Sequence, residues 1–242
     1  MAQTVQEPRS RLSRDSRLFL PAAIGIGIGV VLGFGPTYFY RPFVTPKDSL
    51  TLLVHLHGAL MSAWIALFAT QVILVATGRT ALHRRLGRVG IVLLFLIALV
   101  ALPMIIVAAK LGGDHMPGPA LPGLALVLGL LISFLTLAGL GLHYRFRSDI
   151  HKRLMILAAL AAMEAAVSRL PLDFSDSIVR VHAANDALLL LVVAADSIRH
   201  RRVHPAFLWG SVFLIAVQTF STWLSGTAVW GRIAQSILAA FS

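Results

Sequence analysis

The sequence contains no cysteine, and only 13% of its 242 residues are charged. Without cysteine the chain cannot form disulfides, Cys-ligated zinc sites or iron–sulfur clusters. A soluble domain has about 25% charged residues, so this chain has too little polar surface to fold in water. Hydrophobic residues make up 57% of it, which predicts a protein embedded in the lipid bilayer.

Acidic residues are scarce as well: ten Asp and Glu accompany 21 Lys and Arg, and the net charge is +11. In a soluble protein such an excess indicates nucleic-acid binding. Here the positive charges stand in short groups between apolar runs, as the topology signals of membrane proteins do. We therefore expect the lipid bilayer as the partner, and no nucleic acid.

Seven segments are long and apolar enough to cross a membrane, which takes about 20 residues in a helix. They are residues 18–39, 50–77, 89–109, 121–142, 154–170, 178–198 and 207–229. We predict an all-α integral membrane bundle of about seven transmembrane helices over residues 17–242, preceded by a polar cytoplasmic tail over residues 1–16. The fifth and sixth segments differ from the others because each has an ionisable residue in its interior.

The positive-inside rule predicts the orientation. With the N-terminus in the cytoplasm, the cytoplasmic side holds Arg9, Arg11, Arg14, Arg17, Arg79, Arg84, Arg85, Arg88, Arg145, Arg147, Lys152, Arg153, Arg199, Arg201 and Arg202. The outer side holds only Arg41, Lys47, Lys110, Arg169, Arg180 and Arg232. The first apolar segment is longer than the core of a signal peptide, so we expect it to be retained as a helix. The C-terminus then lies on the outer side.

Small residues and histidines suggest how the helices are arranged. Gly25, Gly29 and Gly33 recur every four residues in the first segment, a spacing that lets membrane helices approach closely. Three basic turns, residues 81–90, 149–158 and 202–211, each contain a His at the inner boundary. We interpret the chain as one leading helix followed by three related helical hairpins.

A polar site is predicted near the outer face. Ionisable residues within spans are costly and face the interior of a bundle. His57, Glu164 and Asp186 all lie roughly 9–12 Å below the outer boundary at 1.5 Å per residue. Arg169 lies nearer the surface.

Polar residues that line one face of each of two predicted helices also indicate such a site. His57, Trp64 and Gln71 share one face of the second segment, and His182, Asn185, Asp186 and Asp196 share one stripe of the sixth. We expect the two stripes and Glu164 to meet in one buried, hydrated site. In the alternative arrangement each group has a private partner, with Glu164 paired to Arg169 and Asp186 bound to a water or a backbone carbonyl.

Such a site is compatible with two kinds of cofactor. The first is haem b, held by His57 and His182 at the outer end, with a second haem held by His83 and His151 at the inner end. The second is a transition metal ion, Zn, Cu or Fe, on imidazole and carboxylate ligands. The metal-ligand candidates are His55, His57, His182, Asp186 and Glu164. His55 and His57 are two residues apart and point in nearly opposite directions on a regular helix.

Two functions need no cofactor. A carboxylate–histidine chain within a membrane is typical of proton relays, which favours a proton-coupled transporter. Small His-bearing bundles also act as accessory or assembly subunits of membrane complexes, and a homo-oligomer is equally compatible with the pattern. The sequence has no G-x-S-x-G, H-E-x-x-H or S-x-x-K motif, so it leaves open whether the protein is an enzyme.

Several motifs resemble those of a group of uncharacterised bacterial inner-membrane proteins. The resemblance rests on HLHGALMSAW followed by Gln71 and GRTALHRRLGR, and on RSDIHKRLM and RHRRVHPAFLWG. It implies a polytopic protein of the bacterial inner (cytoplasmic) membrane, with the C-terminus on the periplasmic side. The His residues at helix ends give a more distant likeness to haem-handling bundles of the cytochrome b561 or haem A synthase type.

Overall fold

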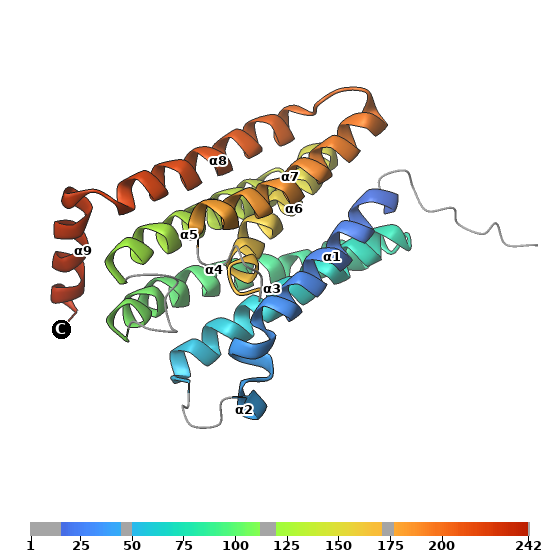
Figure 1. The fold of residues 1–242 in the computed structure, drawn as a ribbon. Helices are drawn as coiled ribbons and strands as arrows, with labels where there is room; N and C mark the ends of the chain where they lie inside the picture. Colours follow the sequence, from blue (N-terminus) through green and yellow to red (C-terminus); the bar gives the residue numbers. More distant parts are fainter. Residues whose placement is uncertain (1–15, 45–49, 112–119, 171–176, 242) are drawn as a thin grey trace, which may run out of the picture.

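The computed structural model describes residues 16–44, 50–111, 120–170 and 177–241, and all regular structure within them is helical. The elements are α1 (Ser16–Phe34), a π-helical turn η1 (Gly35–Phe39), α2 (Arg41–Val44), α3 (Leu52–Ala76), α4 (Thr80–Leu111), α5 (Ala120–His143), α6 (Ser148–Val167), α7 (Ile178–His200), α8 (Pro205–Ser225) and α9 (Ala228–Ala240). Figure 1 shows the long helices running side by side, with α9 turned away from them at one end.

The described chain forms an all-α, multi-pass membrane bundle. Six helices are long and apolar enough to cross a bilayer: α1 with η1, α3, α4, α5, α7 and α8. Large apolar side chains stand on their outer faces, such as Phe95 and Leu191, which are 67% and 66% exposed. Such surfaces are stable only against lipid, so the prediction of a membrane bundle is confirmed at this level.

Helix α6 occupies the interior of the bundle. It packs against α5, α1, α7 and α8, and almost all its residues from Leu154 to Val167 are buried. The shielded position explains how α6 can hold buried polar groups such as Arg153 and Glu164: they face protein instead of lipid. Both polar clusters described below are built on this helix.

Two glycines bring α1 close to α6. A Cβ added at Gly33 would lie 2.2 Å from the carbonyl oxygen of Ala166, and one added at Gly29 would lie 2.4 Å from Cε of Met163. The predicted close-packed glycine face is therefore confirmed at these two positions. At Gly25 a Cβ would meet no atom within 4 Å, so the contact covers only the second half of the predicted face.

Several predicted boundaries differ from those observed. The basic segments 81–90 and 149–158 are helical, because α4 begins at Thr80 and α6 at Ser148. Long Arg and Lys side chains reach the membrane surface from a helix as well as from a turn. The predicted span 207–229 ends earlier, at Ser225, and its last residues begin α9.

Helices α3 and α4 pack together, as do α5 and α6, which agrees with two of the predicted hairpins. Of the predicted tail only Ser16, the first residue of α1, is described.

Candidate buried polar site

Polar side chains from α6, α7 and α8 meet one turn before the end of α6. Glu164 is 8% exposed, and its Oε2 accepts a hydrogen bond from Nε2 of Gln218 at 2.6 Å. Its Oε1 lies 3.1 Å from Nδ1 of His182. The other ring nitrogen of His182, Nε2, lies 3.0 Å from Oγ1 of Thr222. We call these four residues, together with Asp186, the Glu164 cluster.

Asp186 adds a second carboxyl to this cluster. It follows His182 by one turn of α7, interacts with the Gln218 side chain, and lies within electrostatic range of Glu164 and His182. Two neighbouring carboxyls and an imidazole can share protons among themselves. The cluster therefore has more proton-accepting positions than one ionised carboxylate.

Several polar atoms of this region are buried without a hydrogen-bond partner among the described residues. They are Nδ1 of His182, both amide atoms of Asn185, Oδ1 of Asp186 and Oε1 of Gln218. Nδ1 of His182 is at ion-pair distance from Glu164, but it is out of line for a hydrogen bond. Buried polar groups in proteins are nearly always paired with protein or water. These atoms therefore call for water or a small polar ligand.

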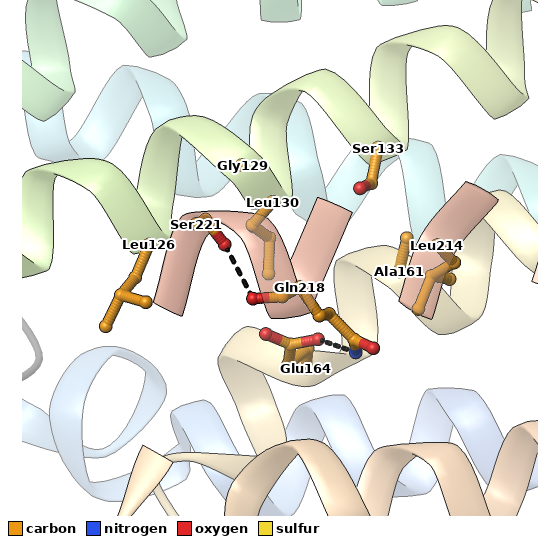
Figure 2. Close-up of a pocket in the computed structure, with 9 residues that line it drawn as sticks. All are labelled: Leu126, Gly129, Leu130, Ser133, Ala161, Glu164, Leu214, Gln218 and Ser221. Atoms are coloured by element: carbon orange, nitrogen blue, oxygen red, sulfur yellow. Dashed lines mark hydrogen bonds between the residues drawn. The ribbon is translucent and has the colours of Figure 1, made fainter. Parts of the chain in front are cut away.

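A small cavity adjoins the cluster. Figure 2 shows it lined by Glu164 and Gln218, by Ser221 and Ser133, and by apolar residues of α5, α6 and α8. Its volume is about 10 Å³, which is near the minimum for one water molecule. Small-molecule sites occupy about 300–1,000 Å³. The chamber thus fits water and protons, and it is far too small for haem.

A second polar cluster lies toward the other end of α6. The guanidinium of Arg153 donates to both carboxylate oxygens of Asp196 on α7, from Nε and Nη2, each at 2.9 Å. Nη1 donates to the backbone carbonyl of Asp149 at 2.8 Å. The guanidinium also lies over the ring of Phe207, and Nδ1 of His200 is 2.9 Å from the carbonyl oxygen of Asp196. We call Arg153, Asp196 and His200 the Arg153 cluster.

His204 joins α6 to α8 beside this cluster. Its Nδ1 accepts a hydrogen bond from the backbone N–H of Ala206 at 3.1 Å and so caps α8. Its Nε2 lies 3.3 Å from Oδ2 of Asp149. Burial and then the charge of Arg153 lower the pKa of His204, while Asp149 acts in the opposite direction. These contacts require a neutral ring with its proton on Nε2.

The stripe predicted on the second segment faces the interior of the bundle. Trp64 is 2% exposed and packs edge-on against Phe134. Three of its polar atoms are buried and have no hydrogen-bond partner within the described part of the chain: His57 Nδ1, Trp64 Nε1 and Gln71 Oε1. Their helix, α3, packs against α1 and α4, whereas His182 contacts α6 and α8. The structure therefore does not show this stripe meeting the Glu164 cluster.

The remaining outer residues have other neighbours. His57 lies within electrostatic range of Arg169. Arg169 donates to the carbonyl oxygen of Ala165 at 2.6 Å and lies over the ring of Phe34, so it is not the ion-pair partner of Glu164. His55 is exposed and stacks near Tyr38; it therefore points away from His57, as its spacing predicted.

The five predicted metal ligands are divided by this arrangement. Glu164, His182 and Asp186 come together, while His55 and His57 lie elsewhere. In residues 16–44, 50–111, 120–170 and 177–241, no group of three or more His, Asp or Glu side chains is arranged to hold a metal ion. The structure thus brings together three of the five predicted ligands.

The inner histidine pair does come together. The rings of His83 on α4 and His151 on α6 are 6.2 Å apart between centroids and nearly perpendicular. Nδ1 of His151 is 2.7 Å from the carbonyl oxygen of Gly141, so this nitrogen donates and Nε2 remains as an acceptor. Nδ1 of His83 is buried without a partner. Both rings thus have a nitrogen available for a ligand.

Sequence reasoning missed two contributors to these clusters. Gln218 is not among the predicted site residues, yet it donates directly to Glu164. Arg153 was counted as a topology signal, yet it is 2% exposed and paired with Asp196. The signal for this pair was Asp196 itself, because a carboxylate within the apolar run LLLLVVAAD needs a cation.

Comparison with protein-family models, curated proteins and solved structures gives no match to this chain.

Proposed function

We propose that this protein is a proton-coupled transporter in which the Glu164 cluster binds and releases the coupled proton. The observation that carries the proposal is one buried group of two carboxyls and an imidazole, contributed by α6 and α7 and tied to α8. It adjoins a cavity of about 10 Å³, which is sized for water. Carboxylate and His groups in this setting are typical of proton relays.

The hydrogen bonds explain how a proton would act on the helices. Ionised Glu164 accepts from the amide of Gln218, whereas protonated Glu164 becomes a donor and needs an acceptor. The unpartnered Oε1 of Gln218 supplies one after rotation of its amide. His182 lies between Glu164 and Thr222, so its protonation alters a second contact. A proton therefore changes the ties between α6, α7 and α8, which is what coupling to helix movement requires.

Apolar packing favours access from one side at a time. Leu157 and Leu160 separate Glu164 from Arg153 along α6, and Leu189 separates Asp186 from Asp196 along α7; all three leucines are at most 2% exposed. Such a dry layer blocks a continuous water path. We infer from the charge distribution that the N-terminus is cytoplasmic in a bacterial inner membrane, which puts the Glu164 cluster near the periplasmic face.

Proton flux into vesicles tests this function. The purified protein is reconstituted in liposomes that contain a pH-sensitive dye, and a membrane potential is imposed. We expect the wild type to acidify or alkalinise the lumen faster than protein-free vesicles, and Glu164→Gln to reduce that rate at least tenfold. Asp149→Asn, which changes an exposed carboxyl on the same helix, is the control. Wild-type flux equal to that of empty vesicles, or full flux in Glu164→Gln, argues against transport.

The inner histidine pair supports a second candidate, a haem-binding or redox-active protein. Two neighbouring imidazoles would hold a haem b or a transition metal ion through one ring nitrogen each. His83 and His151 are 6.2 Å apart. The bond from His151 to the Gly141 carbonyl matches the orienting contact of metal-bound His. A bound haem b, or a Cu or Fe ion, would supply electron transfer, and these two rings would hold it.

The visible spectrum separates the two candidates. If the second holds, the purified protein shows a haem band that shifts on dithionite reduction, and His83→Ala and His151→Ala each remove it. Elemental analysis detects a colourless metal on the same residues. A protein with neither cofactor nor proton flux would instead match the accessory-subunit alternative. His57 is not part of the inner pair, so we expect His57→Ala to leave any such band unchanged.

A further inference from the structure

The last helix, α9, crosses the end of the bundle. Figure 1 shows it turning sharply away from α8 and ending beside α4 and α5. It packs against α5, α4 and α8, and Thr227 caps its start by accepting from the N–H of Trp230. The indole of Trp230 donates to the carbonyl oxygen of Leu121 at 2.8 Å. A small core containing Trp230, Ala234, Ile105 and Leu124 fixes the helix in this position.

Helix α9 has three distinct faces. Trp230 and Ala234 are buried against the bundle. Arg232, Gln235 and Ser236 are exposed and lie within about 100° of one another at 3.6 residues per turn. Between the buried and the polar face stand Val229 and Ile233, which are 54% and 45% exposed. A helix bounded by protein, water and lipid at once has this three-way division.

An open groove follows the border between the polar and the exposed apolar face. Arg232 and Ser236 line its polar edge, and Ile233, Ile237, Ala240 and Phe241 line its apolar part. At its end Nζ of Lys110, from the last turn of α4, donates to the carbonyl oxygen of Phe241. The ammonium group of Lys110 therefore lies at the end of a strip of apolar surface.

The adjoining helix shows what lies beside this strip. Phe220 and Trp223 near the end of α8 are 57% and 65% exposed, on a helix apolar enough to cross the membrane. Trp is frequent at the level of lipid headgroups. Because α9 begins at Ala228, three residues after α8 ends at Ser225, its apolar strip and Arg232 lie close to the end of this lipid-facing helix.

We propose that α9 lies in the headgroup layer of the membrane and that its groove binds an anionic phospholipid. Arg232 pairs with the phosphate, Ser236 supplies a hydroxyl beside it, and Ile233 and Phe241 contact the start of an acyl chain. This inference needs only that the bundle is in a membrane; it is independent of the proton-coupled function.

Site-specific fluorescence tests the position of α9. Because the chain has no cysteine, the single variants Ile233→Cys and Gln235→Cys can each carry one environment-sensitive probe in liposomes. We expect lipids with a nitroxide on the upper acyl chain to quench the probe at position 233 at least threefold more than the probe at 235. Aqueous iodide should show the reverse preference. Equal quenching of both positions by either agent would overturn the interfacial position.

Native mass spectrometry tests the lipid site itself, with phosphatidylglycerol in the detergent mixture. We expect the wild type to retain one more phosphatidylglycerol than Arg232→Gln, and Gln235→Ala to behave as the wild type. Inorganic phosphate in excess should not displace the retained lipid, since it has no acyl chain. Equal lipid retention in the wild type and Arg232→Gln, or displacement by phosphate alone, would overturn the phospholipid site even if α9 proves interfacial.

Discussion

The Glu164 cluster and the Arg153 cluster both join α6 to α7, yet their polar groups are satisfied to different degrees. Arg153 has acceptors on each of its three nitrogens, and its charge is balanced by Asp196. In the Glu164 cluster two carboxyls share an amide and an imidazole, and several buried atoms have no hydrogen-bond partner. A fully satisfied polar network fixes structure, whereas an incomplete one is costly and marks a functional region.

This difference in hydrogen bonding indicates which part of α6 stabilises the fold and which part serves the proposed function. The bidentate Arg153–Asp196 pair holds α6 to α7 in one arrangement, and Phe207 extends the contact to α8. Glu164 has one hydrogen bond, from Gln218, and one close contact, with Nδ1 of His182, and both can be exchanged. We therefore expect substitutions in the Arg153 cluster to affect mainly folding, and substitutions in the Glu164 cluster to affect mainly activity.

The largest expected effect comes from removing one member of the buried ion pair. Asp196→Ala leaves the guanidinium of Arg153 buried without its counter-ion, which costs about 3–5 kcal/mol. The melting temperature in detergent should fall by roughly 10 °C. Replacing both partners, as Arg153→Met with Asp196→Leu, should restore most of the loss, because an apolar pair leaves no buried charge. An unchanged melting temperature in Asp196→Ala would mean that the pair does not hold the helices.

A smaller effect is expected from the contact between α1 and α6 near Glu164. The Cβ of Gly33→Ala would lie 2.2 Å from the backbone oxygen of Ala166, so the helices must separate, at a cost of about 1–3 kcal/mol. Gly27→Ala is the matched control, since its Cβ meets nothing within 4 Å. It should be neutral or stabilise by about 0.5–1 kcal/mol. Thermal unfolding of the two variants side by side measures the difference, and equal melting temperatures would contradict the close contact.

Glu164→Gln distinguishes a structural from a functional role of Glu164, because it removes the charge of the side chain and keeps its shape. An amide in place of the carboxylate can still bond to Gln218 after rotation, so we expect a stability change of about 1 kcal/mol or less. Proton flux should nevertheless fall at least tenfold. A variant that loses several kcal/mol of stability would instead place Glu164 among the structural groups, together with Arg153.

The smallest effect concerns the cap of α8. His204 must be neutral to accept from Ala206, and burial lowers its pKa below the unfolded value of about 6.5. The stabilisation that this cap gives to the folded state is therefore fully present above about pH 6.5. It is lost as the pH falls through the lower folded-state pKa of His204. His204→Asn keeps a capping oxygen that does not titrate, and a cap is worth about 0.5–2 kcal/mol. Between about pH 7.5 and 5 the wild type should lose more thermal stability than this variant; parallel losses would exclude His204 as the titrating cap.

The membrane class of the protein and the positions of some polar residues could be predicted from the sequence alone. Long apolar runs and helical periodicity predicted the spanning helices, and the stripe of His182, Asn185 and Asp186 faces inward as expected. The depth calculated from the sequence placed Glu164 at the same level as Asp186. These predictions succeeded because burial of ionisable groups in a membrane leaves few alternatives.

The neighbours of each helix could not be predicted in the same way. His57 has the same calculated depth as Glu164, but α3 packs against α1 and α4, and depth carries no information about position around a bundle. The role of Gln218 was hidden for the same reason. Arg153 was misassigned because a basic residue at a helix end is ordinarily a surface residue, and only the interior position of α6 makes it a buried partner.

Infrared difference spectroscopy of the purified protein during a pH titration tests most directly whether Glu164 exchanges protons. The account predicts a carboxyl C=O band that grows and disappears with pH in the wild type and in Asp149→Asn, and that is missing in Glu164→Gln. Identical titration spectra for the wild type and Glu164→Gln would contradict it.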